Sequence, residues 1–255
     1  MSSEEVAKMD TNEVEKEKDE KEMTFLEHLE ELRWRIIYAL IGLVVGAIVC
    51  WIFIDFLVVD VLLRPARENG LPLQNLKPFG QLFLYFQVAI AGGIVLSLPN
   101  IFYQLWKFIA PALKKNEKKY AILIVSYSTI SFLIGIAFAY FVMIPLAFQF
   151  IRNFGTELIK NEFAIDEYVS IIVSVLLAAG FVFELPMISF FLTKLGILTP
   201  DFMKKYRRHA VVIIMVLAAF LTPGTDPVSQ VILAVPLVLL YEISILVSKL
   251  SQSKN

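Results

Sequence analysis

The chain has 255 residues, of which 58% are hydrophobic and 18% are charged, and its formal net charge is −1. This composition excludes an ordinary soluble domain and a basic nucleic-acid-binding protein, and it indicates a protein that crosses a membrane several times. The single cysteine, Cys50, lies in an apolar run, so an internal disulfide is excluded and neither a metal site nor a cofactor is expected.

Residues 1–22 differ sharply from the rest of the chain. They hold nine acidic side chains and four lysines, with almost nothing able to form a core. Because such a segment cannot form a core, we expect a disordered acidic tail. It has neither the apolar stretch of a secretory signal nor the basic character of a transit peptide. A membrane domain follows over residues 23–250, and residues 251–255 form a short C-terminal tail.

The segment from Thr24 to Arg35 predicts an amphipathic helix at the membrane surface. Its apolar side chains recur at the spacing of one helical face: Phe25, Leu29, Leu32 and Ile36. Thr24 and Glu27 have the spacing of a capping box, and Glu31 and Arg35 have that of a helical ion pair. Its glutamates therefore have a structural explanation as well as a functional one.

Six apolar runs of membrane-spanning length predict an all-α membrane protein with six transmembrane helices. They cover residues 36–58, 83–109, 120–145, 168–193, 210–222 and 228–247. The last two are short: the fifth has 13 residues between His209 and Pro223, about 20 Å of helix against a hydrocarbon core of roughly 30 Å. The sixth is interrupted by Pro236 and Glu242.

The basic residues predict the orientation of these helices. Fourteen Lys and Arg residues flank the membrane segments on the side of the two termini, whereas five occupy the opposite loops. Because positive charge stays on the cytoplasmic side, we expect both termini to be cytoplasmic. The loops 59–82 and 146–167 then lie outside, and the prolines of the first favour an ordered cap.

Glu117 is unusual because it follows two lysines and precedes two more in the loop between the second and third runs. A basic cytoplasmic loop rarely needs a carboxylate, so this anion is a candidate for binding an incoming cation. An ion pair with Lys114 or Lys118 on a solvated helix end is the alternative.

Glu184 lies well inside the fourth run. An ionised carboxylate at such a depth costs on the order of 2.5 to 3.5 kcal/mol, so it is expected to be protonated, paired or next to a wet cavity. A functional polar patch is one interpretation. The other is a neutral glutamic acid bonded to Gln87 or Gln104.

Several motifs occur in an order that is typical of one family. They are His28-Leu-Glu-Glu-Leu-Arg33, Phe108-Ile-Ala-Pro-Ala-Leu113 with Glu117, Phe138-Ala-Tyr-Phe141 with Pro145-Leu-Ala-Phe148, Phe183-Glu-Leu-Pro186, and Leu221-Thr-Pro223 with Ser229-Gln230. Over residues 23–250 the chain resembles TatC, the receptor subunit of the twin-arginine protein translocase. The resemblance does not extend to the acidic tail.

The resemblance implies a function. The protein would bind signal peptides with consecutive arginines and, in an oligomeric complex with single-span TatA- and TatB-type subunits, export folded proteins across the bacterial inner membrane using the proton-motive force. The protein would be embedded in membrane lipid. It would not be an enzyme.

The resemblance also implies functional residues. The signal-peptide site would consist of Glu30, Glu31, Leu32, Arg33 and Glu117, with Trp34 and Phe108 helping to shelter it. A second set would contact partners or cargo within the membrane: Glu184, Gln104, Gln230 and Asp226. Asp226 also has an explanation as simple turn chemistry.

A solute transporter and an intramembrane enzyme are the alternatives to a translocase receptor. A proton-coupled solute transporter could use Glu184 and Glu242 as proton carriers, but such transporters usually contain paired repeats, and the sequence has no internal repetition. An intramembrane enzyme finds little support because the sequence has no H-E-x-x-H or G-x-S-x-G motif.

Overall fold

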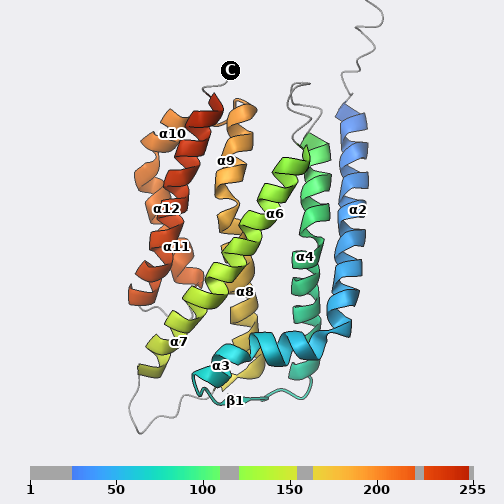
Figure 1. Cartoon of the computed structure of the whole chain (residues 1–255), viewed down its shortest axis with the longest axis vertical. Helices are drawn as coiled ribbons and strands as arrows, with labels where there is room; N and C mark the ends of the chain where they lie inside the picture. Colours follow the sequence, from blue (N-terminus) through green and yellow to red (C-terminus); the bar gives the residue numbers. More distant parts are fainter. Residues whose placement is uncertain (1–24, 110–120, 154–162, 222–226, 253–255) are drawn as a thin grey trace, which may run out of the picture.

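The computed structural model describes residues 25–109, 121–153, 163–221 and 227–252. Long helices dominate it: α2 (Phe25–Ile52), α4 (Gly80–Ile109), α6 (Ala121–Phe138), α8 (Ile165–Phe183), α11 (Arg207–Leu221) and α12 (Pro227–Gln252). They form a bundle, which α6 crosses diagonally (Figure 1). We call the end where α2 begins and α12 ends the terminal end, and the opposite end the cap end.

The lengths of the helices confirm the prediction of an all-α membrane protein. Five helical segments are long and apolar enough to cross a membrane: Glu27–Ile52, Gly80–Ile109, Ile122–Gln149, Ile165–Lys194 and Ala234–Gln252. The last has 19 residues and the others 26 to 30. Helix α11 has 15 residues, about 22 Å, so the fifth segment is short, as expected. Helix α12 has 26 residues, about 39 Å, so the prediction of a short sixth helix is wrong, because Pro236 and Glu242 do not interrupt the helix.

Helix α2 runs without interruption from Phe25 to Ile52. The predicted amphipathic segment is therefore the first part of α2 and not a separate helix, because no helix-breaking residue separates it from the apolar run. Thr24, the predicted cap, lies outside the described residues. The helix also ends six residues before the predicted limit of the first run, at residue 58.

Beyond Ile52 the chain turns across the cap end. It passes through the π-helix η1 (Phe56–Leu62) and the short helix α3 (Arg64–Glu68), which lie across the bundle (Figure 1). Asp55 and Asp60 fall in this segment, and their charge favours a position at the edge of the apolar region.

Two prolines remain inside continuous helices and one divides a helix. Pro99 and Pro236 lie within α4 and α12. Pro186 follows the end of α8, where Glu184 separates α8 from α9 (Leu185–Lys194). The third segment bends through the π-turn η3 (Ala139–Met143) into α7 (Ile144–Asn153), and α10 (Pro200–Lys205) precedes α11.

The cap end is ordered over its described residues. Strand β1 (Leu73–Gln74) pairs in parallel with β2 (Phe163–Ala164). The buried Tyr168 hydroxyl donates to the Leu62 carbonyl oxygen over 3.0 Å and accepts from the Ala66 amide over 3.1 Å, so it joins α8 to η1 and α3. Lys77 forms an ion pair with Asp166 at 2.5 Å. These contacts agree with the predicted cap over its first loop.

Close packing of α2 on α4 depends on small residues. A Cβ atom on Gly46 would lie 2.8 Å from the Gly93 carbonyl oxygen, and one on Gly93 would lie 2.7 Å from the Ala47 amide nitrogen. Gly42 precedes Gly46 by four residues, the spacing that lets transmembrane helices approach closely. Side-chain-free backbone at these positions therefore sets the distance between the two helices.

We expect Gly93→Val to separate α2 from α4 and to destabilise the fold. Overpacking of this kind costs about 1 to 3 kcal/mol, because the atoms that it meets are backbone atoms, which cannot rotate away. Unfolding of the detergent-solubilised protein would measure the change. Ile90→Val, at an exposed position on the same helix, serves as the control, and equal stability of the two variants would contradict this packing argument.

Candidate functional site

A chain of polar contacts joins α2 to α4 near the terminal end. Arg35 Nη2 lies 2.7 Å from Glu31 Oε1, and Arg35 Nη1 donates to Gln104 Oε1 over 3.4 Å. Gln104 Nε2 donates to Asn100 Oδ1 over 3.3 Å, and Asn100 Nδ2 donates to the Tyr38 carbonyl oxygen over 3.0 Å. Arg35 is therefore held between the two helices and fixes the Glu31 carboxylate against α4.

The Glu31 carboxylate is sheltered but only partly satisfied. Its side chain is 16% exposed, and Arg35 contacts Oε1 through both Nε and Nη2. The second oxygen, Oε2, is buried and has no hydrogen-bond partner among the described residues. A buried acceptor without a partner is costly, so this oxygen can receive a donor from a ligand with a favourable change in energy.

Aromatic and apolar side chains lie at the start of α2 and at the end of α4. The His28 ring stacks on Phe108 with centroids 4.4 Å apart, which brings the first turn of α2 against the end of α4. Leu32 is half-buried, whereas Trp34 is 49% exposed and contacts Tyr38. Trp34 therefore lies on the outer surface of the helix, while the shelter expected from Phe108 and Leu32 stays a prediction.

The described residues of the predicted signal-peptide set differ in burial. Glu30 and Arg33 are exposed, and among the described members of the set only Glu31 has a carboxylate that is partly buried. Glu117 lies outside the described residues. Arg35 was missing from the predicted set although its spacing from Glu31 indicated the ion pair, and Gln104 was assigned to a different set although it bonds to Arg35.

Glu184 lies at the break between α8 and α9 and is 5% exposed. It lines a cavity of about 200 Å³ together with Ser128 and the rings of Trp106 and Phe191, which are 5.2 Å apart. Its Oε1 atom has no hydrogen-bond partner within the described part of the chain. A polar atom therefore faces an apolar cavity between α4, α6 and α9.

Neither glutamine considered as a partner of Glu184 has that role. Gln87 Nε2 donates to Ser170 over 3.2 Å, and Gln104 belongs to the Arg35 network. The neighbours of Glu184 come from α6 instead, where Ser128 adjoins its carboxyl group. Ser131, on the same helix, donates to the Phe183 carbonyl oxygen over 2.7 Å.

Two of the remaining predicted residues, Gln230 and Glu242, lie in α12. Gln230 Nε2 donates to the Met215 carbonyl oxygen over 2.8 Å and so ties α12 to α11. Asp226 lies outside the described residues. Glu242, a proton carrier in the transporter alternative, forms an ion pair with Arg207 at 2.5 Å.

These features define a class of protein. Apolar helices of membrane-spanning length, with a sheltered ionic network at one end and a buried carboxyl group near mid-bundle, are those of a multi-span membrane protein. The described residues contain no group of three or more His, Cys, Asp or Glu side chains that could hold a metal ion.

Comparisons with known proteins identify the family. The family model "Sec-independent protein translocase protein (TatC)" matches residues 27–236. The TatC protein of Carboxydothermus hydrogenoformans is 36% identical, over 93% of this chain and 97% of its own, and that of Aquifex aeolicus is 36% identical, over 91% and 98%.

A solved structure agrees with the sequence comparisons. The crystal structure of a twin-arginine translocase receptor, TatC, superposes with a TM-score of 0.78 at 35% identity and covers 88% of this chain and 99% of its own. The chain belongs to the TatC family. It is therefore a multi-span component of the Sec-independent protein translocase, and not an enzyme.

Proposed function

We propose that this protein binds twin-arginine signal peptides at its terminal end through Glu31 and Glu117, with Glu30, Leu32 and Arg33 beside them. Together with single-span TatA- and TatB-type subunits, it exports folded proteins across the bacterial inner membrane using the proton-motive force. The proposal follows from membership of the TatC family and from the sheltered Glu31 carboxylate.

The proposal rests on the burial and the hydrogen bonding of the Glu31 carboxylate. Ion pairs in open solvent contribute roughly 0 to 1 kcal/mol, too little for selective capture of a peptide. Hydrogen bonds to charged groups in sheltered positions contribute about 1.5 to 3 kcal/mol. Glu31 is sheltered and one of its oxygens has no partner among the described residues, so a guanidinium group bound there gains the larger amount.

Arg35 has a positioning role in this proposal. It occupies Oε1 of Glu31 and is itself held by Gln104, which leaves Oε2 as the acceptor for the ligand. A guanidinium group is planar, permanently charged and able to direct two N–H groups at one oxygen, as Arg35 does at Glu31 Oε1, whereas an ammonium group is a compact point charge. A fixed carboxylate with a defined free oxygen therefore favours arginine over lysine.

The direction of transport follows from the distribution of charge. With both termini in the cytoplasm, as the basic residues favour, the Glu31 site faces the compartment in which precursor proteins are made. The cap end then faces the opposite compartment.

Glu184 is assigned a separate role in contacting partner helices or passing cargo. Its unpartnered oxygen lies buried at a helix break inside the bundle, so a movement of α9 relative to α6 would be needed before a polar side chain of another membrane segment bonds to it. We also propose Gln230 and Asp226 as contact points for partners or cargo. Gln104 is more readily explained by its place in the Glu31 network.

The solute-transporter alternative receives less support. Glu242 is compensated by Arg207, so it is not a free proton carrier of the kind that this alternative requires. Membership of the TatC family also favours a translocase component.

We expect Glu31→Gln to weaken binding of a twin-arginine signal peptide by about 10- to 100-fold, because a charged acceptor worth about 1.5 to 3 kcal/mol is replaced by a neutral amide of the same shape. Photo-crosslinking of the peptide to the protein in membranes measures the effect. Asp201→Asn removes the same charge from a side chain that is 94% exposed and serves as the control. Equal crosslinking of all three proteins would refute the site.

Glu184→Gln tests the division of roles. We expect the variant to bind the signal peptide as well as the parent protein does, but to export a folded reporter protein several-fold more slowly, because the amide no longer offers partner helices or cargo a carboxyl group at this buried position. Peptide crosslinking and reporter export are measured on the same membranes, at matched protein levels. A parallel loss of peptide binding would show that the two sites are not separate.

A further inference from the structure

A second cavity lies between five elements in the cap half of the bundle. It has a volume of about 560 Å³, and its walls come from the end of α2, from η1, and from the middle parts of α4, α6 and α8. All sixteen lining residues are apolar or sulfur-containing, and no charged, hydroxyl or amide side chain is among them. The cavity is therefore distinct from the Glu31 network and from the cavity beside Glu184.

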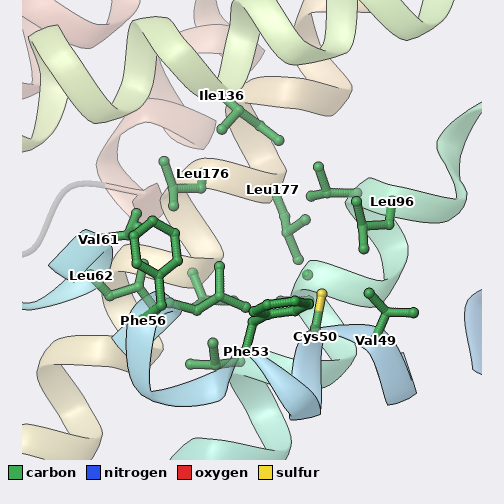
Figure 2. A pocket seen from close by; sticks show the side chains of 16 residues that line it. Val49, Cys50, Phe53, Phe56, Val61, Leu62, Leu96, Ile136, Leu176 and Leu177 are labelled. Atoms are coloured by element: carbon green, nitrogen blue, oxygen red, sulfur yellow. The ribbon is translucent and has the colours of Figure 1, made fainter. Parts of the chain in front are cut away.

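Figure 2 shows how the side chains enclose this space. Phe53, Phe56, Val61 and Leu62 form one wall along the end of α2 and η1. Ile136 points towards them from α6, and Leu96, Leu176 and Leu177 close the sides (Figure 2).

The mouth of the cavity opens among lipid-facing side chains. Phe53, Phe56 and Leu96 are 60%, 58% and 55% exposed, whereas Cys50 and Val88 in the interior are 5% and 4% exposed. Val88 and Leu96 belong to a helix of membrane-spanning length. The opening is thus a lateral one, towards the hydrocarbon of the bilayer.

The lining determines what can fill the space. Water needs two to four polar partners in a cavity, and these walls offer none. An empty space of this size would deprive all the lining groups of dispersion contacts. A flexible hydrocarbon chain meets both conditions, and the volume falls in the range of roughly 300 to 1,000 Å³ that is common for sites of small ligands.

A charged group beside the cavity indicates which hydrocarbon is bound. Asp60, Arg64, Arg67 and Glu68 line a shallow hollow of about 510 Å³ at the surface of the cap end. Asp60 is the neighbour of Val61, which lines the apolar cavity, so consecutive Cα atoms about 3.8 Å apart join the two environments. Arg64 pairs with Glu68 at 2.7 Å and Arg67 lies 3.9 Å from Asp60, so the group consists of two exposed ion pairs. Exposed pairs of this kind contribute little to stability, and their two positive and two negative side chains complement a headgroup that carries both a phosphate and an ammonium group.

We propose that this site binds a zwitterionic phospholipid, with one acyl chain in the apolar cavity and the headgroup against the group formed by Asp60, Arg64, Arg67 and Glu68. The phosphate pairs with the arginines and the ammonium group with the carboxylates, in exchange for the ion pairs Arg64–Glu68 and Arg67–Asp60. Such a lipid fills the space that η1 and α6 leave between them, and it thereby supports the cap half of the bundle.

The experiment uses the full-length protein in vesicles that contain phosphatidylethanolamine with a photoactivatable diazirine at the end of one acyl chain. We expect crosslinks on peptides of α4 and α8 that line the cavity. Ile136→Phe and Leu96→Trp fill the space and lower the crosslinking yield there by about 10-fold, equivalent to about 1.4 kcal/mol of lost burial. Ile134→Phe and Ile90→Trp, at exposed positions outside the cavity on the same helices, leave it unchanged.

Equal yields for the filling variants and their controls would overturn the acyl-chain site. The site would also be overturned if, in native membranes, the lining positions crosslinked to another protein instead of to lipid. The headgroup is tested by competition with unlabelled lipids that have identical chains. Phosphatidylethanolamine should compete better than phosphatidylglycerol, and the double variant Arg64→Gln/Glu68→Gln should remove this preference. No preference in the parent protein would overturn the headgroup assignment. Because Glu31 lies at the other end of α2, either result leaves the signal-peptide site to its own test.

Discussion

The close approach of α2 to α4 is the constraint on which the rest of the structure depends. Between helices in a membrane, lipid removes most of the hydrophobic driving force, so association rests on van der Waals packing and interhelical hydrogen bonds. Gly46 and Gly93 allow the two backbones to touch. Nearer the terminal end, Asn100 on α4 donates a hydrogen bond to the Tyr38 carbonyl oxygen on α2. Only at this distance can Arg35 on α2 bond to Gln104 on α4 and hold Glu31 in place.

Polar groups in the bundle differ in how completely they are satisfied. Arg207 pairs with Glu242, and Tyr168 uses its hydroxyl as both donor and acceptor. By contrast, Glu31 Oε2, Glu184 Oε1 and Asp166 Oδ1 are buried without a partner in the described part of the chain, and Asp166 pairs with Lys77 through its other oxygen. Unsatisfied acceptors are costly in a bilayer, so they are the positions at which a ligand or partner contributes most.

The sequence was sufficient to predict the class of fold and several contacts. Apolar runs predicted the helices, the spacing of Glu31 and Arg35 predicted their ion pair, and the prolines near residue 65 favoured an ordered cap. These features are local, or depend on length and composition alone.

Other features required the three-dimensional packing. Periodicity could not tell whether the segment before Arg35 was a separate helix, because nothing in it breaks the helix that continues to Ile52. The neighbours of Glu184 on α6 and the link from Arg35 to Gln104, 69 residues apart, depend on how helices cross. The apolar cavity has no sequence signal, since its lining residues are scattered over five elements and resemble any lipid-facing side chain.

The most direct test of the central claim is titration calorimetry on the purified protein with two signal peptides that differ only in having consecutive arginines or consecutive lysines. A sheltered carboxylate with one free oxygen predicts binding of the arginine peptide that is tighter by about 10-fold or more, as planar bidentate donors gain roughly 1.4 kcal/mol or more over a point charge. Equal affinity for the two peptides would contradict the account.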